Sequence, residues 1–270
     1  MKLNKKMIEI VVLRISLFLV AIIALALLAA PRIVDMIMFP APTPSYDWSM
    51  QGVVNVGWEE SPVAAYWVEN SDSQKVILYS YGNGEDIGID KQFFHFLSTA
   101  GCSVFAYDYP GYGLTAGKPS EQGVYAASEA AYRFLVEQKN IAPADIVVMG
   151  RSLGGGPACY LAEKFPVGAL ILESTFTSAP RVKTGIRILP YDPFPNIVRI
   201  KNITCPKLII HGTRDETVPF SHAKKLAAAA PQPCRLAVFE GSGHDDILID
   251  AQGQETFIAL IREFLESGGR

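Results

Sequence analysis

Cysteine is rare in this chain, and its spacing excludes two kinds of site. The 270 residues contain four cysteines, at positions Cys102, Cys159, Cys205 and Cys234. No two of them have the C-x-x-C spacing of a zinc or redox motif, and their scatter fits no disulfide framework. The sequence therefore implies neither a structural disulfide network nor a metal site.

Positive charge is also scarce in the body of the chain. The 24 lysines and arginines are outnumbered by 27 acidic residues, which gives a formal net charge of −3. No Lys/Arg cluster occurs after the N-terminal segment. A protein that binds a nucleic-acid backbone normally presents a basic surface, so we expect no nucleic-acid partner.

A nucleotide-binding loop is absent as well. Gly111, Gly113 and Gly117 resemble a dinucleotide fingerprint, but the third glycine falls one residue late. Pro110 interrupts the entry to this loop, and no helical pattern starts after it. The sequence therefore implies no organic cofactor.

Only one stretch is continuously hydrophobic over many residues, and it lies near the N-terminus. Ile15–Ala30 is apolar and is preceded by Arg14 and by the lysines of the first six residues. A membrane-spanning helix needs about 20 apolar residues, and Ile10–Leu13 extend the run if Arg14 reaches the interface. We expect residues 1–40 to form an uncleaved single-pass anchor and hinge, with the cytoplasmic N-terminus that the basic flank favours. A cleaved signal peptide, leaving a secreted or periplasmic protein, is the alternative.

Residues 45–270 are numerous enough for one large domain. Short apolar, β-branched runs alternate there with helical patterns, which predicts an α/β fold with a mostly parallel sheet covered by helices on both faces. The active site of such a sheet lies at the carboxyl ends of its strands. Residues 174–202 read as a short irregular insertion, too small for a large cap domain. The expected strands are 63–69, 75–81, 102–108, 145–149, 168–172, 207–210 and 235–239, and the expected helices are 90–99, 121–138, 157–163, one from about 221, and 255–266.

One motif within this pattern points to chemistry. Gly150-x-Ser152-x-Gly154 follows a buried strand and precedes a helix, as in a nucleophile elbow. There a serine lies on a sharp, strained turn, and flanking glycines leave room for the strand and the helix. We expect Ser152 to be the nucleophile, although a Gly-Ser turn after a core strand would have the same letters.

A serine nucleophile needs a general base, and the chain offers four histidines. His244 lies in a glycine-rich loop after the last predicted strand, from which it can reach the elbow. His95 falls on a helix, His211 is expected to be packed and hydrogen-bonded, and His222 is expected to be a solvated or capping residue. We therefore assign the base to His244.

The acid that orients the base should follow an intervening strand. Asp215 is in that place, and Glu173 at the end of the preceding strand is the second candidate. The order Ser152, Asp215, His244 is the nucleophile, acid, base order of the α/β-hydrolase fold. For the oxyanion hole we expect the main-chain N–H groups of Leu153 and Asn83.

At this point the chain resembles a known family. From about Lys75 to Leu265 it is similar to membrane-associated abhydrolase-domain serine hydrolases, above all the protein depalmitoylases. The resemblance implies an α/β-hydrolase catalytic domain over residues 45–270. It rests on these segments: Tyr107–Gly113 with Gly117–Glu121, Gly150–Gly154, Phe194–Ile197, Ile210–Asp215, Phe220–His222 and Glu240–His244.

Two features depart from this family pattern. Tyr81-Gly82-Asn83 stands where family members usually have His-Gly-Asn. The depalmitoylases also have a cysteine-rich, acylated N-terminus, whereas this chain has no cysteine before Cys102 and carries a hydrophobic segment instead. The first departure bears on how the oxyanion loop is held, although its main-chain donor is unaffected. The second bears on the natural substrate and on the side of the membrane, and it leaves the reaction type unchanged.

The sequence thus predicts a serine hydrolase of carboxylic esters or thioesters that works through an acyl-enzyme. Its expected partners are an acyl substrate and, through the N-terminal segment, membrane lipid. A serine peptidase of the same fold is the first alternative. A catalytically inert, membrane-tethered binding protein is the second.

Overall fold

A computed structural model describes residues 5–57, 62–184 and 192–268 of the chain. It divides into two compact units, Met1–Met38 and Phe39–Arg270, which are treated separately below. The first compact unit ends two residues before the predicted boundary at residue 40.

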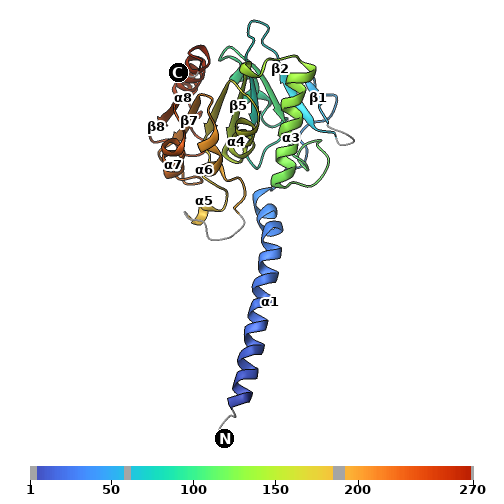
Figure 1. Ribbon diagram of the computed structural model, residues 1–270. Coiled ribbons are helices and arrows are strands. Elements are labelled where there is room, and N and C mark those ends of the chain that lie inside the picture. Colours follow the sequence, from blue (N-terminus) through green and yellow to red (C-terminus); the bar gives the residue numbers. More distant parts are fainter. Residues whose placement is uncertain (1–4, 58–61, 185–191, 269–270) are drawn as a thin grey trace. The chain divides into compact units, whose positions relative to one another are not determined.

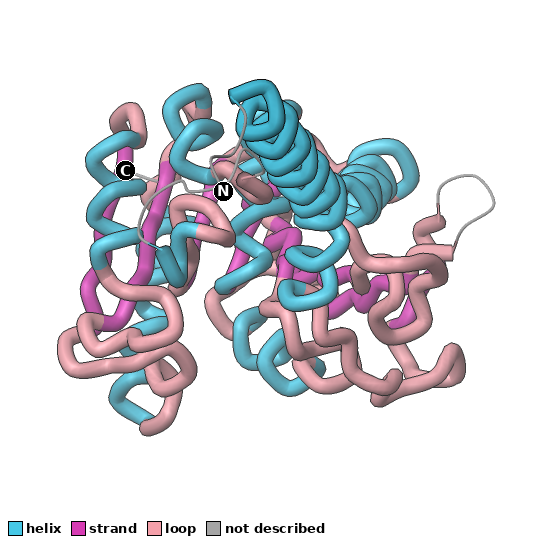
Figure 2. Tube along the Cα trace, turned by 90° about the horizontal axis from the view of Figure 1, so that it is seen from below, coloured by secondary structure: helices cyan, strands magenta, loops and turns pink. Residues whose placement is uncertain are grey.

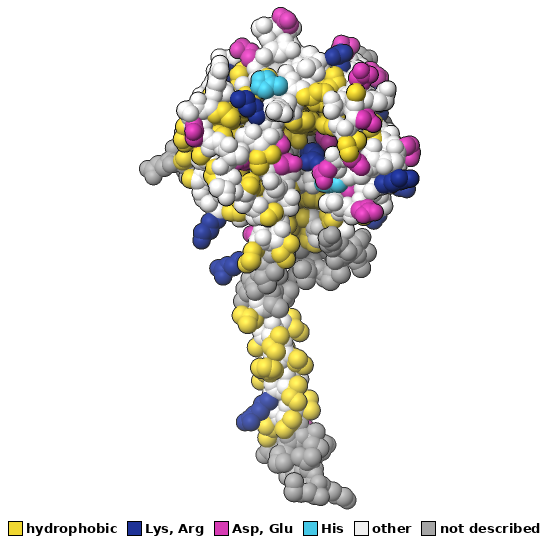
Figure 3. Space-filling model, turned by 180° about the vertical axis from the view of Figure 1, so that it is seen from behind, with side chains coloured by type: hydrophobic (Ala, Val, Ile, Leu, Met, Phe, Trp, Pro, Cys, Tyr) yellow, Lys and Arg dark blue, Asp and Glu magenta, His cyan; other side chains and the backbone are white. Residues whose placement is uncertain are grey.

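The first unit is one long helix, α1 (Lys5–Met38). Its described apolar side chains between Ile10 and Leu25 are largely exposed, and Figure 3 shows apolar side chains along its length. Among the helices of the described residues, none combines the length and apolarity needed to cross a membrane.

The second unit is built on an eight-stranded sheet, which curves through the body in Figure 1. The strands lie in the order β1-β2-β4-β3-β5-β6-β7-β8. Strands β3 to β8 run parallel, while β1 and β2 pair antiparallel at one edge. The strands are β1 (Val53–Asn55), β2 (Ala64–Val68), β3 (Val76–Ser80), β4 (Ser103–Tyr107), β5 (Ile146–Arg151), β6 (Ala169–Glu173), β7 (Lys207–Gly212) and β8 (Cys234–Phe239).

Helices cover both faces of this sheet (Figures 1 and 2). Tyr125 of α3 stacks on Tyr160 of α4 with ring centroids 4.1 Å apart, so these two helices lie side by side. Phe93 of α2 contacts Phe257 of α8, which places α2 and α8 together. Because both faces are covered, β3 to β6 are almost wholly buried, as their near-continuous apolar sequences predict. The longer helices are α2 (Lys91–Ser98), α3 (Glu121–Arg133), α4 (Gly155–Lys164), α7 (Ser221–Ala229) and α8 (Ala251–Glu266).

The structure adds details that the sequence analysis did not predict. Strand β1 is new, and the helix predicted to run to residue 138 ends at Arg133 and continues as a π-helical turn, Phe134–Gln138. The expected insertion contains two short helices, α5 (Arg181–Thr184) and α6 (Asn196–Arg199), followed by the 3-10 turn Ile200–Asn202. Residues 185–191 of that insertion lie outside the described residues.

The segment that follows α1 is bonded to the body by two buried carboxylates. The Ser45 N–H donates to Asp86 Oδ2 at 2.8 Å, and its hydroxyl also bonds Asp86. The Tyr46 hydroxyl donates to Asp108, which also accepts from Tyr81 Oη at 2.7 Å. Burial raises the pKa of Asp108 to about 6, although these donors favour its ionised form. Residues 45 and 46 are thus part of the folded domain.

Replacing Tyr46 by Phe removes a donor from this buried carboxylate. We expect Tyr46→Phe to lower the free energy of unfolding by about 1.5–3 kcal/mol at pH 8, the range for a hydrogen bond to a charged group. The pKa of Asp108 is higher in the folded state than in the unfolded state, where it is about 3.9. Its ionisation therefore costs stability as the pH rises to about 6, and the Tyr46 bond offsets this cost only where the carboxylate is ionised.

Urea denaturation of Tyr46→Phe at pH 5 and pH 8 tests this, with the larger loss expected at pH 8. Tyr132→Phe is the matched control, since its hydroxyl donates to the neutral carbonyl of Pro166. Equal losses in the two variants at both pH values would contradict the role of Asp108.

Candidate active site

Ser152 lies on a sharp turn directly after β5. Its φ is +52°, a left-handed conformation that is strained for a residue with a side chain. A 3-10 turn, Ser152–Gly154, leads into α4, which begins at Gly155. The strand, turn and helix predicted for a nucleophile elbow are therefore present, and the helix starts two residues earlier than predicted.

The elbow fits against the end of β3 only because residue 154 is glycine. A Cβ atom at this position would lie 1.9 Å from the carbonyl oxygen of Ser80. At residue 150, a Cβ atom would lie 2.1 Å from the carbonyl oxygen of Gly154. The turn is also held by the segment that follows β6, because Thr175 Oγ1 donates to the carbonyl of Ser152 at 2.7 Å.

His244 bridges the two other predicted residues. Its Nδ1 lies 2.8 Å from Asp215 Oδ2, and its Nε2 lies 3.1 Å from Ser152 Oγ. An ionised carboxylate only accepts hydrogen bonds, so Nδ1 carries the proton and donates to Asp215. Nε2 is then free to accept from the Ser152 hydroxyl, which is the arrangement that a general base requires.

Asp215 is held ionised by its surroundings. Burial alone would raise the pKa of Asp215, but donors outweigh it and hold the pKa well below its usual range. These donors are His211 Nε2, whose proton is shared between Asp215 Oδ2 at 3.2 Å and the Val218 carbonyl at 2.7 Å, then His244 Nδ1 and the Val218 N–H at 2.6 Å. His211 is therefore packed and hydrogen-bonded as predicted, and it supports the acid.

The two expected oxyanion donors come from neighbouring elements. Leu153 follows the nucleophile and is buried, and Asn83 lies on the loop after β3. This loop is fixed at two points: Tyr112 Oη donates to the Asn83 carbonyl at 2.8 Å, and the Gly82 N–H donates to Glu85 Oε2 at 2.8 Å. Tyr81, at the position where the resemblance leads us to expect histidine, donates its hydroxyl to Asp108 Oδ1 at 2.7 Å.

The remaining candidates have other roles. Glu173, the second candidate for the acid, is buried and lies 3.7 Å from Arg151 Nε as an ion pair. The prediction for His222 was wrong, because the residue is buried and its Nδ1 accepts the Thr177 N–H at 3.1 Å. Burial, and then the charge of Lys225, lowers the pKa of His222 to about 4, which keeps the ring neutral.

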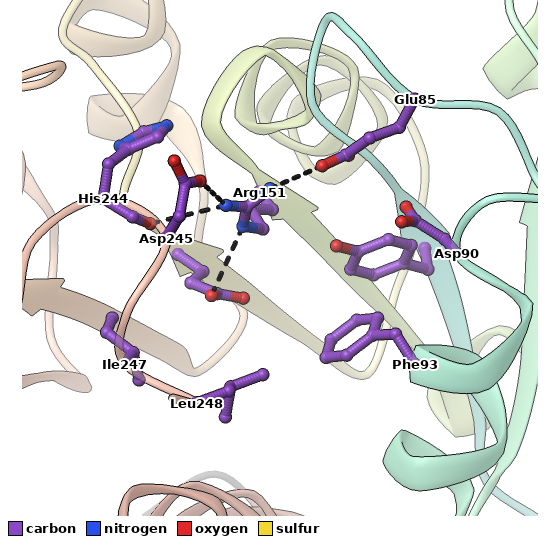
Figure 4. A pocket seen from close by; sticks show the side chains of 10 residues that line it. Glu85, Asp90, Phe93, Arg151, His244, Asp245, Ile247 and Leu248 are labelled. Atoms are coloured by element: carbon purple, nitrogen blue, oxygen red, sulfur yellow. Dashed lines mark hydrogen bonds and ion pairs between the residues drawn. The ribbon is translucent and has the colours of Figure 1, made fainter. Parts of the chain in front are cut away.

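Sequence reasoning missed Arg151, the residue directly before the nucleophile. In Figure 4 its guanidinium lies between Glu85 on one side and His244 and Asp245 on the other. Nη1 donates to Glu85 Oε1 at 2.8 Å, while Nη2 bonds Asp245 and the His244 carbonyl.

These residues line a cavity of about 290 Å³ whose apolar wall includes Phe93. The only sequence signal for this role was a basic residue inside the elbow motif, between Gly150 and Ser152.

Comparisons with known proteins identify relatives of this chain. The sequence model of the family described as Serine aminopeptidase, S33, matches residues 71–194. Alpha/beta hydrolase domain-containing protein 17B from Homo sapiens is 39% identical over 207 residues, which are 75% of this chain and 70% of that protein. Protein 17C from Xenopus tropicalis is 37% identical over 196 residues, covering 72% and 62%. The chain belongs to the α/β-hydrolase domain-containing protein 17 family.

Solved structures show the same fold for this α/β-hydrolase. The esterase Pf2001 from Pyrococcus furiosus has a TM-score of 0.68 at 19% identity, covering 84% of this chain and 98% of that one. A monoacylglycerol lipase from Paleococcus ferrophilus has a TM-score of 0.60 at 19% identity, covering 78% and 100%. The predicted mostly parallel sheet flanked by helices is thereby confirmed, and the α/β-hydrolase is a serine hydrolase of this family.

The close approach of Gly154 to β3 leaves no room for a side chain at this position. We expect Gly154→Ala to lower the free energy of unfolding by at least about 1–3 kcal/mol, because the new methyl group meets the rigid backbone of β3. Gly84→Ala is the control, since a Cβ atom there meets nothing within 4 Å. Thermal or urea unfolding measures both variants, and equal stabilities would contradict the fit.

Proposed function

We propose that this serine hydrolase, of the esterase or thioesterase type, cleaves acyl bonds through a Ser152–His244–Asp215 triad. The observation that carries the proposal is the single imidazole of His244 within hydrogen-bonding distance of both Ser152 Oγ and Asp215. Three side chains from separate loops have no structural need to form this chain of bonds, whereas nucleophilic catalysis requires it.

The reaction then follows from the donors and acceptors at the site. His244 Nε2 takes the Ser152 proton as Oγ attacks the acyl carbonyl carbon. The carbonyl oxygen becomes an oxyanion that the Leu153 and Asn83 N–H groups stabilise. His244 gives the proton to the departing alkoxide or thiolate, which leaves an acyl-enzyme. Water, deprotonated by the same ring, attacks the ester carbonyl and releases the acid.

Substitution of each triad residue tests this mechanism. We expect Ser152→Ala and His244→Ala to lower kcat on p-nitrophenyl acyl esters by about 10⁴-fold or more, and Asp215→Asn by about 10⁴-fold. Labelling of Ser152 by a fluorophosphonate should fail in Ser152→Ala and be strongly slowed in the other two. Glu216→Gln, an exposed neighbour of Asp215, is the control. Unchanged activity in His244→Ala would contradict the assigned base.

Peptide-bond cleavage is the second candidate, and the family name Serine aminopeptidase, S33, favours it. Esters and thioesters have better leaving groups than amides, so activity on both classes needs a direct comparison. We expect acyl esters and thioesters to be cleaved with a higher kcat/KM than aminoacyl anilides. A preference for the anilides would make the protein a peptidase of the same triad. Labelling and turnover that are absent with every substrate would support the inert binding protein.

We also propose that α1 holds the enzyme at a membrane, where long-chain acyl groups are available. The exposed apolar side chains from Ile10 to Leu25 support this, and Arg14 is the one charged residue among them. The resemblance to depalmitoylases supports this substrate class, although the chain has no cysteine before Cys102.

The membrane proposal is tested by charging the apolar surface of α1. We expect the full chain to sediment with liposomes and a Leu17→Asp/Leu25→Asp variant to remain in the supernatant, since each buried charge costs about 2.5–3.5 kcal/mol. Activity on a soluble short-chain ester should be unchanged. Co-sedimentation of the charged variant would contradict the proposal, and a shortened mature N-terminus found by mass spectrometry would favour the cleaved signal peptide.

A further inference from the structure

The geometry points to Arg151 as a positioning residue that fixes the loop of the general base and the loop of the oxyanion hole relative to the nucleophile. This inference rests on the proposed function and concerns the same site. Arg151 ends β5, so its backbone is fixed in the sheet next to Ser152.

One end of the guanidinium holds the oxyanion loop. Arg151 Nη1 donates to Glu85 Oε1 at 2.8 Å, and Glu85 Oε2 accepts the Gly82 N–H at 2.8 Å. The Glu85 carboxylate therefore connects Arg151 to the main chain next to Asn83. Because Asn83 supplies the expected second donor, the bridge sets where that donor lies.

The other end holds the loop of the general base. Arg151 Nη2 bonds the carboxylate of Asp245 and donates to the His244 carbonyl at 3.4 Å. One contact is to the main chain of His244 and the other is to the side chain of the next residue, Asp245. Neither involves the His244 ring, which remains directed at Ser152. In Figure 4 the two sets of contacts extend from opposite sides of one side chain.

The position of Arg151 makes this bridge stronger than an ordinary surface ion pair. Exposed pairs contribute little because both side chains are mobile and screened by salt. Asp245 is 78% exposed and would make such a pair by itself, but the Arg151 side chain is only 16% exposed. The Glu173 carboxylate, buried at the end of β6, lies 3.7 Å from Arg151 Nε and restrains the guanidinium from a third side.

The shape of the guanidinium is essential to this role. Its planar fork directs separate N–H groups at separate acceptors, whereas the ammonium of lysine is a single point charge on a flexible chain. Lysine could keep the charge and contact one carboxylate, but it could not hold both loops at once. A lysine at position 151 therefore keeps the positive charge but loses the geometry that the bridge requires.

Kinetics of Arg151→Lys and Arg151→Ala test it. We expect kcat on a p-nitrophenyl ester to fall about 10- to 100-fold in both, the cost of a misplacement of about 1 Å, with KM changed much less. Guanidinium ion at millimolar concentration should restore part of the kcat of Arg151→Ala, while the same concentration of sodium should not. Arg235→Lys, in an exposed ion pair with Glu263, is the control and should keep the wild-type kcat.

Asp245→Asn provides a test that does not depend on the folding of the Arg151 variants, because Asp245 is exposed. We expect it to lower kcat several-fold, and to add little to the loss in Arg151→Lys, since both changes break the same bridge. Full kcat in Arg151→Lys, or additive losses in the double variant, would overturn the inference. If the wild-type chain hydrolyses no ester, the proposed function fails instead, so the two failures are distinguishable.

Discussion

The ring of His244 bonds two partners at once, and this is possible because the sheet brings three loops to one edge. Ser152 follows β5, Asp215 follows β7 and His244 follows β8, and these strands belong to a continuous parallel ladder. Register within the ladder decides whether the side chains meet, since a slip of one residue turns every side chain to the other face. The 3.1 Å and 2.8 Å bonds of the ring thus depend on packing throughout the sheet.

The arrangement around the ring combines strain with restraint. The positive φ of Ser152 is maintained because Gly154 packs against the carbonyl of Ser80. Asp215 accepts from three donors, and burial keeps the His222 ring neutral. In each case the surroundings fix one protonation state or one conformation in advance. Catalysis by the proposed mechanism then requires little rearrangement when a substrate binds.

Much of the fold followed from the sequence because its determinants are local. The apolar runs that form β3 to β7 are buried on both faces, and Gly150, Ser152 and Gly154 mark a turn whose spacing is fixed by sterics. The role of Arg151 could not be predicted, because its partners Glu85 and Asp245 are 66 and 94 residues away in the chain. Strand β1 has three residues, too few for a periodic pattern. The burial of His222 arises from packing between elements, which no local pattern records.

In the proposed mechanism, Ser152 forms a covalent acyl intermediate. Rapid acid quenching of the enzyme during turnover of a p-nitrophenyl ester, followed by proteolysis and mass spectrometry of the peptides, tests it most directly. The account predicts a mass increase equal to the acyl group on the peptide that contains Ser152, and none in Ser152→Ala. Turnover with no acylated peptide, or with the acyl group on another residue, would contradict it.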